Sequence, residues 1–196
     1  MLVIDCETTG TYYKRHSIAS IGAVDFDHPD RQFYRECQIY EGAQIDHQAL
    51  DVNGFTRDSL TDPRKPSLED AVREFCTWAG VDVTAGGNPD FDWKFLRESA
   101  KKYNIPWQLA RVAIDIISLC YGHQLKRRVP KEDMVAKRAT VDETLHYAGL
   151  PTEPRPHHAL TGAKMEAEAL SRLVSGKGLF EEYKQLLVPE YLRTLP

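Results

Sequence analysis

The sequence has few cysteines, and they do not form a metal-binding or disulfide pattern. Its four cysteines stand more than 30 residues apart, and none belongs to a C-x-x-C pair. Zinc sites and disulfide-rich domains use closely spaced or paired cysteines, so both classes are disfavoured. We therefore expect reduced thiols and a cytoplasmic location.

Long hydrophobic runs are also missing. The apolar stretches extend over only a few residues, whereas a helix needs roughly 20 apolar residues to cross a bilayer. Met1 is followed directly by apolar residues, without the basic leader of a signal peptide. The sequence thus predicts neither a membrane span nor a secretory signal, and no membrane partner.

A strong charge bias is absent too. The chain carries 25 basic and 29 acidic residues, for a net charge of −4, and 42% of its residues are hydrophobic. This composition is typical of a globular domain rather than a disordered chain. With 196 residues and no internal repeat, residues 1–196 are expected to form one domain, with a helical extension from about residue 177.

The periodicity of apolar residues predicts the order of the elements. Strands are expected at 1–6, 17–26, 32–39, 81–85 and 111–114, and helices at 68–79, 88–103, 115–124, 140–149, 158–175 and 179–187. Three strands followed by alternating helices and strands predict an α/β fold, with a mixed sheet of about five strands and helices on both faces. This is the order of a ribonuclease-H-like fold.

Two acidic residues end the first predicted strand. Asp5 and Glu7 are two residues apart, so their carboxylates project from one face with Cα atoms about 6 to 7 Å apart. Like charges at a buried strand end need a cation or a shared proton, and Mg²⁺ or Mn²⁺ prefers such oxygen ligands. The same acid-x-acid spacing recurs at 25/27, 90/92 and 166/168, so the pair alone does not identify a site.

Three segments together are more specific. The first is Asp-Cys-Glu-Thr-Thr-Gly at 5–10, the second Asn-Pro-Asp-Phe-Asp at 88–92, and the third His-His-Ala-Leu-Thr-Gly-Ala at 157–163. In sequence and order they resemble the three motifs of the DEDDh (DnaQ-like) exonucleases, which include the proofreading subunit of bacterial DNA polymerase III. Two positions differ: Gly87 stands where the family often has His, and Gly162 stands at the last metal-binding Asp.

The resemblance covers about residues 1–175 and implies a function. Members of the family hydrolyse the terminal phosphodiester of DNA or RNA from the 3′ end and release nucleoside monophosphates. They do so with two divalent ions, Mg²⁺ or Mn²⁺. The partner implied here is the 3′ end of a nucleic acid, taken to be single-stranded. The sequence leaves open the choice between DNA and RNA, the pathway and the oligomeric state.

The resemblance also assigns roles to single residues. Asp5 would bridge both ions, Glu7 would bind the ion beside the attacking water, and Asp92 would help to place the second ion. His157 would be the general base, because an imidazole pKa of about 6.5 lies near working pH. Candidates for contacts with the substrate are Thr8, Thr9 and Asn88.

Gly162 is the main departure from the family. A glycine inside a helix costs about 1 kcal/mol relative to alanine, so helix stability does not explain it. Glu166 lies four residues further on the same helical face, and helical side chains lean toward the N-terminus. We therefore predict that Glu166 replaces the missing metal ligand. Glu168, six residues on, projects from roughly the opposite face.

Two other functions remain open at this point. A degenerate exonuclease fold could bind nucleic acid ends or a protein partner without turnover, and Gly162 favours that interpretation. A polynucleotidyl transferase or ribonuclease H could share the fold, but those families do not account for the third motif. The segment 126–138, with six basic and two acidic residues, is either a phosphate-binding loop or a solvated one.

Overall fold

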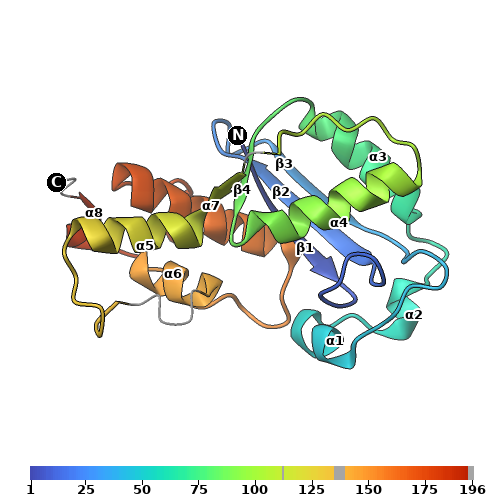
Figure 1. The fold of residues 1–196 in the computed structure, drawn as a ribbon, viewed down its shortest axis with the longest axis horizontal. Helices are drawn as coiled ribbons and strands as arrows, with labels where there is room; N and C mark the ends of the chain where they lie inside the picture. Colours follow the sequence, from blue (N-terminus) through green and yellow to red (C-terminus); the bar gives the residue numbers. More distant parts are fainter. Residues whose placement is uncertain (112, 135–139, 194–196) are drawn as a thin grey trace.

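A five-stranded mixed sheet forms the centre of the protein (Figure 1). The computed structural model describes residues 1–111, 113–134 and 140–193. The strands are β1 (Leu2–Thr8), β2 (Ile18–Asp25), β3 (Gln32–Glu36), β4 (Thr84–Gly86) and β5 (Ala113–Asp115), in the spatial order β3-β2-β1-β4-β5. β1 is antiparallel to β2 and parallel to β4, which is parallel to β5. The predicted α/β, ribonuclease-H-like fold is confirmed.

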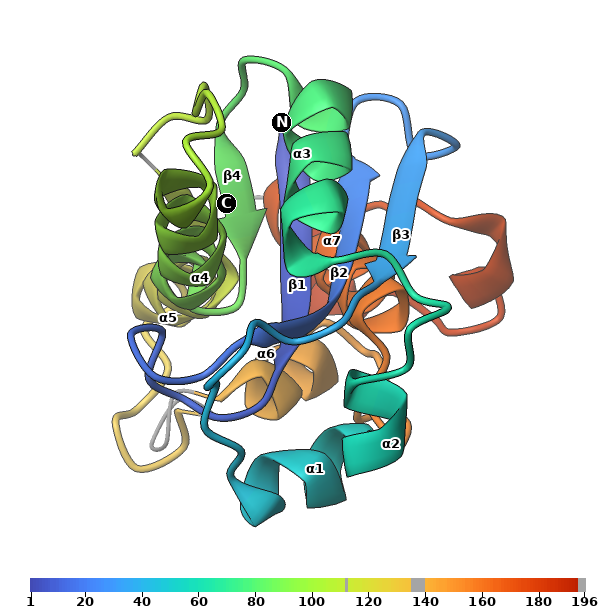
Figure 2. The same ribbon diagram turned by 90° about the vertical axis from the view of Figure 1, so that its right-hand side faces the viewer.

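Helices cover both faces of this sheet. Figure 2 shows α3 (Leu68–Ala79) and α4 (Pro89–Lys102) in front of the strands and α7 (Ala159–Ser175) behind them. The other helices are α1 (His47–Asn53), α2 (Arg57–Leu60), α5 (Ile116–Lys126), α6 (Val141–Tyr147) and α8 (Glu190–Arg193). None of the helices in the described ranges is both long enough and apolar enough to cross a membrane.

Successive side chains of β1 face opposite sides of the sheet, and Asp5 and Glu7 share one of these faces. Leu2, Ile4 and Cys6 belong to the hydrophobic core that also contains residues of α3 and α4. Val3 belongs to the second core, with residues of α5, α6 and α7. Because alternate residues of a strand face the same side, Asp5 and Glu7 continue the face of β1 that α7 covers.

A glycine in β2 allows α7 to lie close to the sheet. Gly22 pairs with Asp5 across the β1–β2 ladder. A Cβ on Gly22 would lie only 2.1 Å from the carbonyl carbon of Ala159, in the first turn of α7. The absence of a side chain at Gly22 therefore allows the N-terminus of α7 to pack against β1 and β2 beside Asp5.

Most predicted helix ends agree with the structure. The Ser67 side chain accepts the N–H of Asp70 at the start of α3, and Thr140 forms a capping box with Glu143 at the start of α6. Asn88 differs, because it has a φ of 56° and its side chain caps nothing. Its own N–H instead donates to Oδ1 of Asp115, at 3.1 Å.

The predicted helix at 179–187 is wrong. The segment contains only a 3₁₀ turn, Glu181–Tyr183. The N–H groups of Leu179 and Phe180 donate to Glu168, and the carbonyl of Leu186 accepts from Arg172. Side chains of α7 therefore hold this segment by its backbone, through contacts that the sequence pattern does not report. The short helices α1 and α2 lie in residues 40–66, which the sequence pattern did not assign.

Candidate active site

Four carboxylates from three elements meet near the C-terminal half of β1. Asp5 and Glu7 come from β1, Asp92 from the first turn of α4, and Glu166 from α7. Oδ1 of Asp92 accepts the N–H of Cys6 at 2.9 Å, which fixes the start of α4 against β1. The structure thus brings together the four carboxylates that the sequence predicted as metal ligands.

Asp5 is at the centre of this group. Its pKa is raised well above its usual value, first by burial and then by the negative charges of Glu166, Asp92 and Glu7. A buried carboxylate surrounded by like charges either keeps its proton or binds a cation. Oxygen-only ligands of this kind match the preference of Mg²⁺ and Mn²⁺.

Glu166 provides a direct sign that a cation fits here. Its residue is only 6% exposed, and its Oε2 has no hydrogen-bond partner in the part of the chain that the structure describes. Burial, followed by the charge of Asp92, raises its pKa well above the usual value. Leaving a buried carboxylate oxygen without a donor is costly, and a divalent ion would compensate its charge. The residues present therefore fit the divalent ions that the fold implies.

The other two carboxylates show the same effect of burial. Burial raises the pKa of Asp92 to about 8, although the N–H of Cys6 lowers it. Burial and the charge of Glu153 raise the pKa of Glu7 to about 7, while a hydrogen bond from Asn53 lowers it. Both groups hold protons near neutral pH in the absence of a cation, so metal binding must release protons.

His157 lies beside Glu7, just before α7. Its backbone N–H donates to the carbonyl of Val52 in α1 at 3.0 Å, and the ring atom Nδ1 lies 3.3 Å from Oε2 of Glu153. Its pKa is lowered first by burial and then by the positive charge of Arg155. The imidazole is therefore neutral near pH 7, the form that can accept a proton.

His158 points elsewhere. Its ring stacks on Tyr34 of β3, with ring centroids 4.2 Å apart and an interplanar angle of 23°. Both side chains line a pocket of about 300 Å³ that also includes Lys65. The stacking gives His158 a packing role and leaves His157 as the histidine in contact with the carboxylates.

Thr8 and Thr9 lie where β1 leaves the sheet. The hydroxyl of Thr8 donates to the carbonyl of Gly10 at 2.8 Å. Thr9 is fully buried, and its hydroxyl donates to the carbonyl of Gln44 and accepts the N–H of Ser17. These bonds give both side chains a part in holding the loop. Contact with substrate by Thr8, Thr9 or the exposed Asn88 stays a prediction.

The basic segment 126–138 is described only up to residue 134, so its last part lies outside the described residues. Within the described part, the Arg127 guanidinium lies 4.3 Å from the ring centroid of Tyr191 and donates to the hydroxyl of Tyr147. Arg127 therefore connects α5 to α6 and α8. Phosphate binding by this segment stays a prediction.

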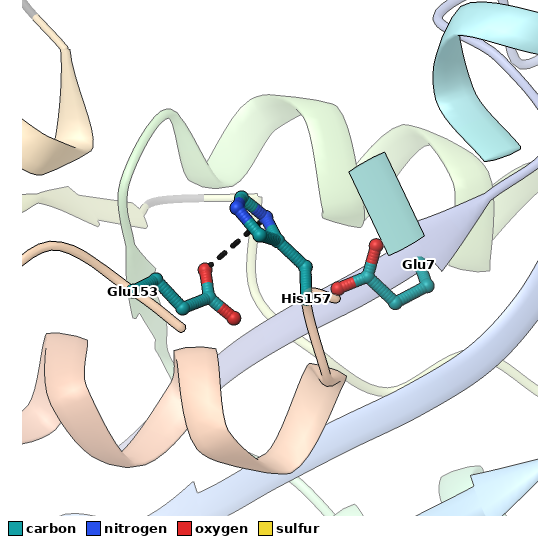
Figure 3. A group of neighbouring side chains, drawn as sticks. All are labelled: Glu7, Glu153 and His157. Carbon is teal, nitrogen blue, oxygen red and sulfur yellow. Dashed lines mark ion pairs between the residues drawn. The ribbon is translucent and has the colours of Figure 1, made fainter. Parts of the chain in front are cut away.

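Glu153 is the acidic residue of the site that the sequence did not reveal. Glu7, Glu153 and His157 each offer a ligand atom within 4.8 Å of the others (Figure 3). Burial raises the pKa of Glu153 to about 7, although the hydrogen bond from the backbone N–H of His158 lowers it. The only signal was an acid in a proline-rich loop ahead of the third motif. The sequence signal for Gly22 was clearer, because a glycine inside a strand often marks the close approach of another backbone segment.

Comparisons with known proteins agree with this architecture. Two PolC-type DNA polymerase III proteins are similar over most of the chain: that of Thermotoga petrophila is 28% identical over 88% of it, and that of Bacillus subtilis is 24% identical over 85%. The matched region spans only 12% of the length of either relative.

Solved structures show the same fold. A zinc-bound complex of Escherichia coli exonuclease I with single-stranded DNA has a TM-score of 0.67 at 16% identity, over 88% of this chain and 39% of that one. The nuclease domain of 3′hExo, a DEDDh family member bound to rAMP, has a TM-score of 0.58 at 16% identity, over 96% and 95%. The RNase_T exonuclease family model matches residues 2–170. The chain therefore belongs to this exonuclease family, as its resemblance to the DEDDh enzymes predicted.

Proposed function

We propose that this protein is a metal-dependent 3′-to-5′ exonuclease that hydrolyses terminal phosphodiesters of DNA or RNA to nucleoside monophosphates. The observation that carries the proposal is the convergence of Asp5, Glu7, Asp92 and Glu166 at one site, with His157 beside them. An acid cluster next to a neutral imidazole suits phosphodiester hydrolysis, which needs both charge compensation and a base.

The residues divide the chemistry between them. Divalent ions, when bound, would lower the pKa of the attacking water and stabilise charge on the leaving oxygen. Asp5, Glu7, Asp92 and Glu166 would hold those ions. His157 takes the proton of the water as its oxygen bonds to phosphorus and the bond from phosphorus to the 3′ oxygen breaks. Because Glu153 contacts Nδ1, we assign the proton transfer to Nε2.

The substrate class rests on the similar proteins. The solved complex of exonuclease I contains single-stranded DNA, and the 3′hExo domain is bound to rAMP. Both are consistent with a site for the 3′ end of a single strand. Neither sugar is excluded here, because discrimination depends on contacts to the 2′-hydroxyl.

The proposal predicts metal-dependent shortening from the 3′ end. A DNA and an RNA oligonucleotide of the same sequence, each 5′-labelled, would be incubated with Mg²⁺, Mn²⁺ or EDTA and resolved as ladders. We expect a ladder of successively shorter products with at least one sugar and one metal, and intact oligonucleotide with EDTA. A matched 3′-labelled oligonucleotide should release its label as a mononucleotide.

Other outcomes would support the competing functions. Label released as an internal fragment would indicate an endonuclease of the ribonuclease H type. Tight binding of 3′ ends with no product under any metal would indicate a degenerate fold, in keeping with Gly162. Degradation that persists in EDTA would contradict the metal-dependent mechanism.

The two neighbouring histidines should behave differently. His157→Ala is expected to lower the single-turnover rate by about 10² to 10⁴, the usual scale for a positioned general base. Binding of a 3′ end, measured by fluorescence anisotropy in Ca²⁺, should change little because the carboxylates remain. His158→Ala removes a ring that stacks on Tyr34 and should lower the rate far less. The reverse ranking would show that the third motif is shifted by one residue.

A further inference from the structure

The space at Gly162 is already occupied. A Cβ on Gly162 would lie 2.0 Å from Oδ2 of Asp5 and 3.3 Å from Oε1 of Glu153. Asp5 would have to move to admit any side chain at this position. The atoms nearest to it belong to Asp5 and Glu153. The two carboxylate oxygens of Glu166 lie beside the end of β4, 2.9 Å and 2.8 Å from Cβ atoms built on Gly86 and Gly87.

Glu153 reaches the site from the loop before α7. Its side chain is only 10% exposed, and its Oε2 faces Nδ1 of His157 at 3.3 Å. Its Oε1 accepts the N–H of His158, also at 3.3 Å. Figure 3 shows Glu153 and Glu7 approaching His157 from different segments of the chain, with the Glu153 carboxylate directed at the imidazole.

Glu153 and Glu166 lie at different parts of the carboxylate group. The strongest charge interaction acting on Glu166 comes from Asp92, and Glu166 Oε1 approaches the end of β4, 2.8 Å from a Cβ built on Gly87. The charge that acts on Glu7 is that of Glu153. Glu153 therefore lies with Glu7 and His157, whose ligand atoms are within 4.8 Å of its own, and Glu166 lies at the β4 side of the group. The charges of both glutamates act on Asp5.

We propose that Glu153 supplies the metal-binding carboxylate that Gly162 lacks, and that it binds a divalent ion together with Glu7 and Asp5. The inference rests on the proposed function, because it completes the same site. The buried, unpartnered Oε2 of Glu166 is an independent sign that the group accommodates a cation. On this arrangement, Glu166 is a ligand on the side of Asp92 and no substitute for position 162.

Metal binding tests the proposal without relying on activity. Mn²⁺ would be titrated into the full chain at pH 8 and followed by calorimetry and by the EPR signal of free Mn²⁺. For Glu153→Gln we expect the dissociation constant of one ion to rise at least about tenfold, the lower limit for losing even an outer partner of a metal site. Glu153→Ala should give the same result.

A charge control separates ligation from general electrostatics. The charge of Asp142 acts on both Glu153 and His157, yet Asp142 is exposed and outside the group of three ligand atoms. Asp142→Asn removes the same charge as Glu153→Gln. We expect it to change the Mn²⁺ dissociation constant less than threefold.

Measuring Glu153→Gln in a chain that also carries His157→Ala distinguishes metal binding by Glu153 from orientation of His157 by Glu153. If Glu153 acted only by orienting the imidazole, Glu153→Gln would have no further effect on Mn²⁺ affinity in a His157→Ala chain. As a ligand, it should weaken Mn²⁺ binding there by the same factor as in wild type. An additive loss supports the proposal, and no further loss overturns it.

The measurements distinguish the role of Glu153 from the proposed function. Wild-type protein that binds no Mn²⁺ would overturn both the proposed function and the role of Glu153. Wild-type protein that binds Mn²⁺ and shortens 3′ ends, with Glu153→Gln indistinguishable from Asp142→Asn, would overturn the role of Glu153 alone.

Discussion

Replacing Asp5 with Asn is expected to lower nuclease turnover by about 10³-fold or more. Asp5 interacts with Glu166, Asp92 and Glu7, so both sides of the proposed metal site depend on it. Metal ions contribute several kcal/mol to stabilising the transition state, and about 4 kcal/mol corresponds to 10³ in rate. Single-turnover measurements with saturating Mn²⁺ would give the value.

The same substitution should stabilise the metal-free protein. In carboxyl groups with a raised pKa, the folded state binds more protons than the unfolded state, so stability falls as pH rises from the unfolded to the folded pKa. For this site the window runs from about pH 4 to the pKa values of about 7 for Glu7 and about 8 for Asp92. On folding at pH 8 in EDTA, wild-type protein must either bury the charge of Asp5 or protonate this carboxylate. Asp5→Asn removes that cost, so its melting temperature under these conditions should exceed that of wild type.

The control is a carboxylate outside the site. Asp30 is exposed in the turn between β2 and β3, and Asp30→Asn should leave both turnover and melting temperature unchanged. An Asp5→Asn enzyme within threefold of wild-type turnover would refute the proposed metal site. Lower turnover accompanied by a lower melting temperature at pH 8 would show that the variant acts by disturbing the fold.

The sheet and the motif carboxylates could be predicted because their signals are local. A short apolar run followed by Asp5-x-Glu7 shows a strand end, and the alternation of side chains fixes that both acids share a face. The capping residues Ser67 and Thr140 marked helix starts that the structure places at the same residues. Family membership rested on the order of three such local segments, and the match over residues 2–170 confirms it.

Glu153 could not be predicted because its position depends on the path of a loop. Nothing in Pro-Thr-Glu-Pro at 151–154 indicates that its third residue turns inward while its neighbours stay exposed. The path of this loop depends on the close packing of the first turn of α7 against β2, which the missing side chain of Gly22 allows. The C-terminal segment was misjudged for a similar reason, since Glu168 and Arg172 of α7 bind its backbone.

Those two residues form a buried ion pair that joins several segments. Nε of Arg172 lies 2.7 Å from Oε1 of Glu168, and their side chains are 1% and 0% exposed. Arg172 also donates to the carbonyl of Ala148 at the end of α6 and to that of Leu186. Glu168 Oε2 accepts the N–H of Leu179 at 2.7 Å. The pair therefore fastens α6 and the C-terminal segment to α7.

Arg172→Met is accordingly expected to lower the free energy of unfolding by about 3 to 5 kcal/mol, because it leaves the Glu168 carboxylate buried without its partner. Urea denaturation followed by circular dichroism would measure the change. Arg73→Met is the matched control: Arg73 pairs with Glu69 at the same helical spacing, but these side chains are 51% and 42% exposed. An exposed pair of this kind contributes about 0.3 to 0.5 kcal/mol. Equal losses in the two variants would mean that burial adds nothing to the Arg172–Glu168 pair, contrary to its role in holding the C-terminal segment.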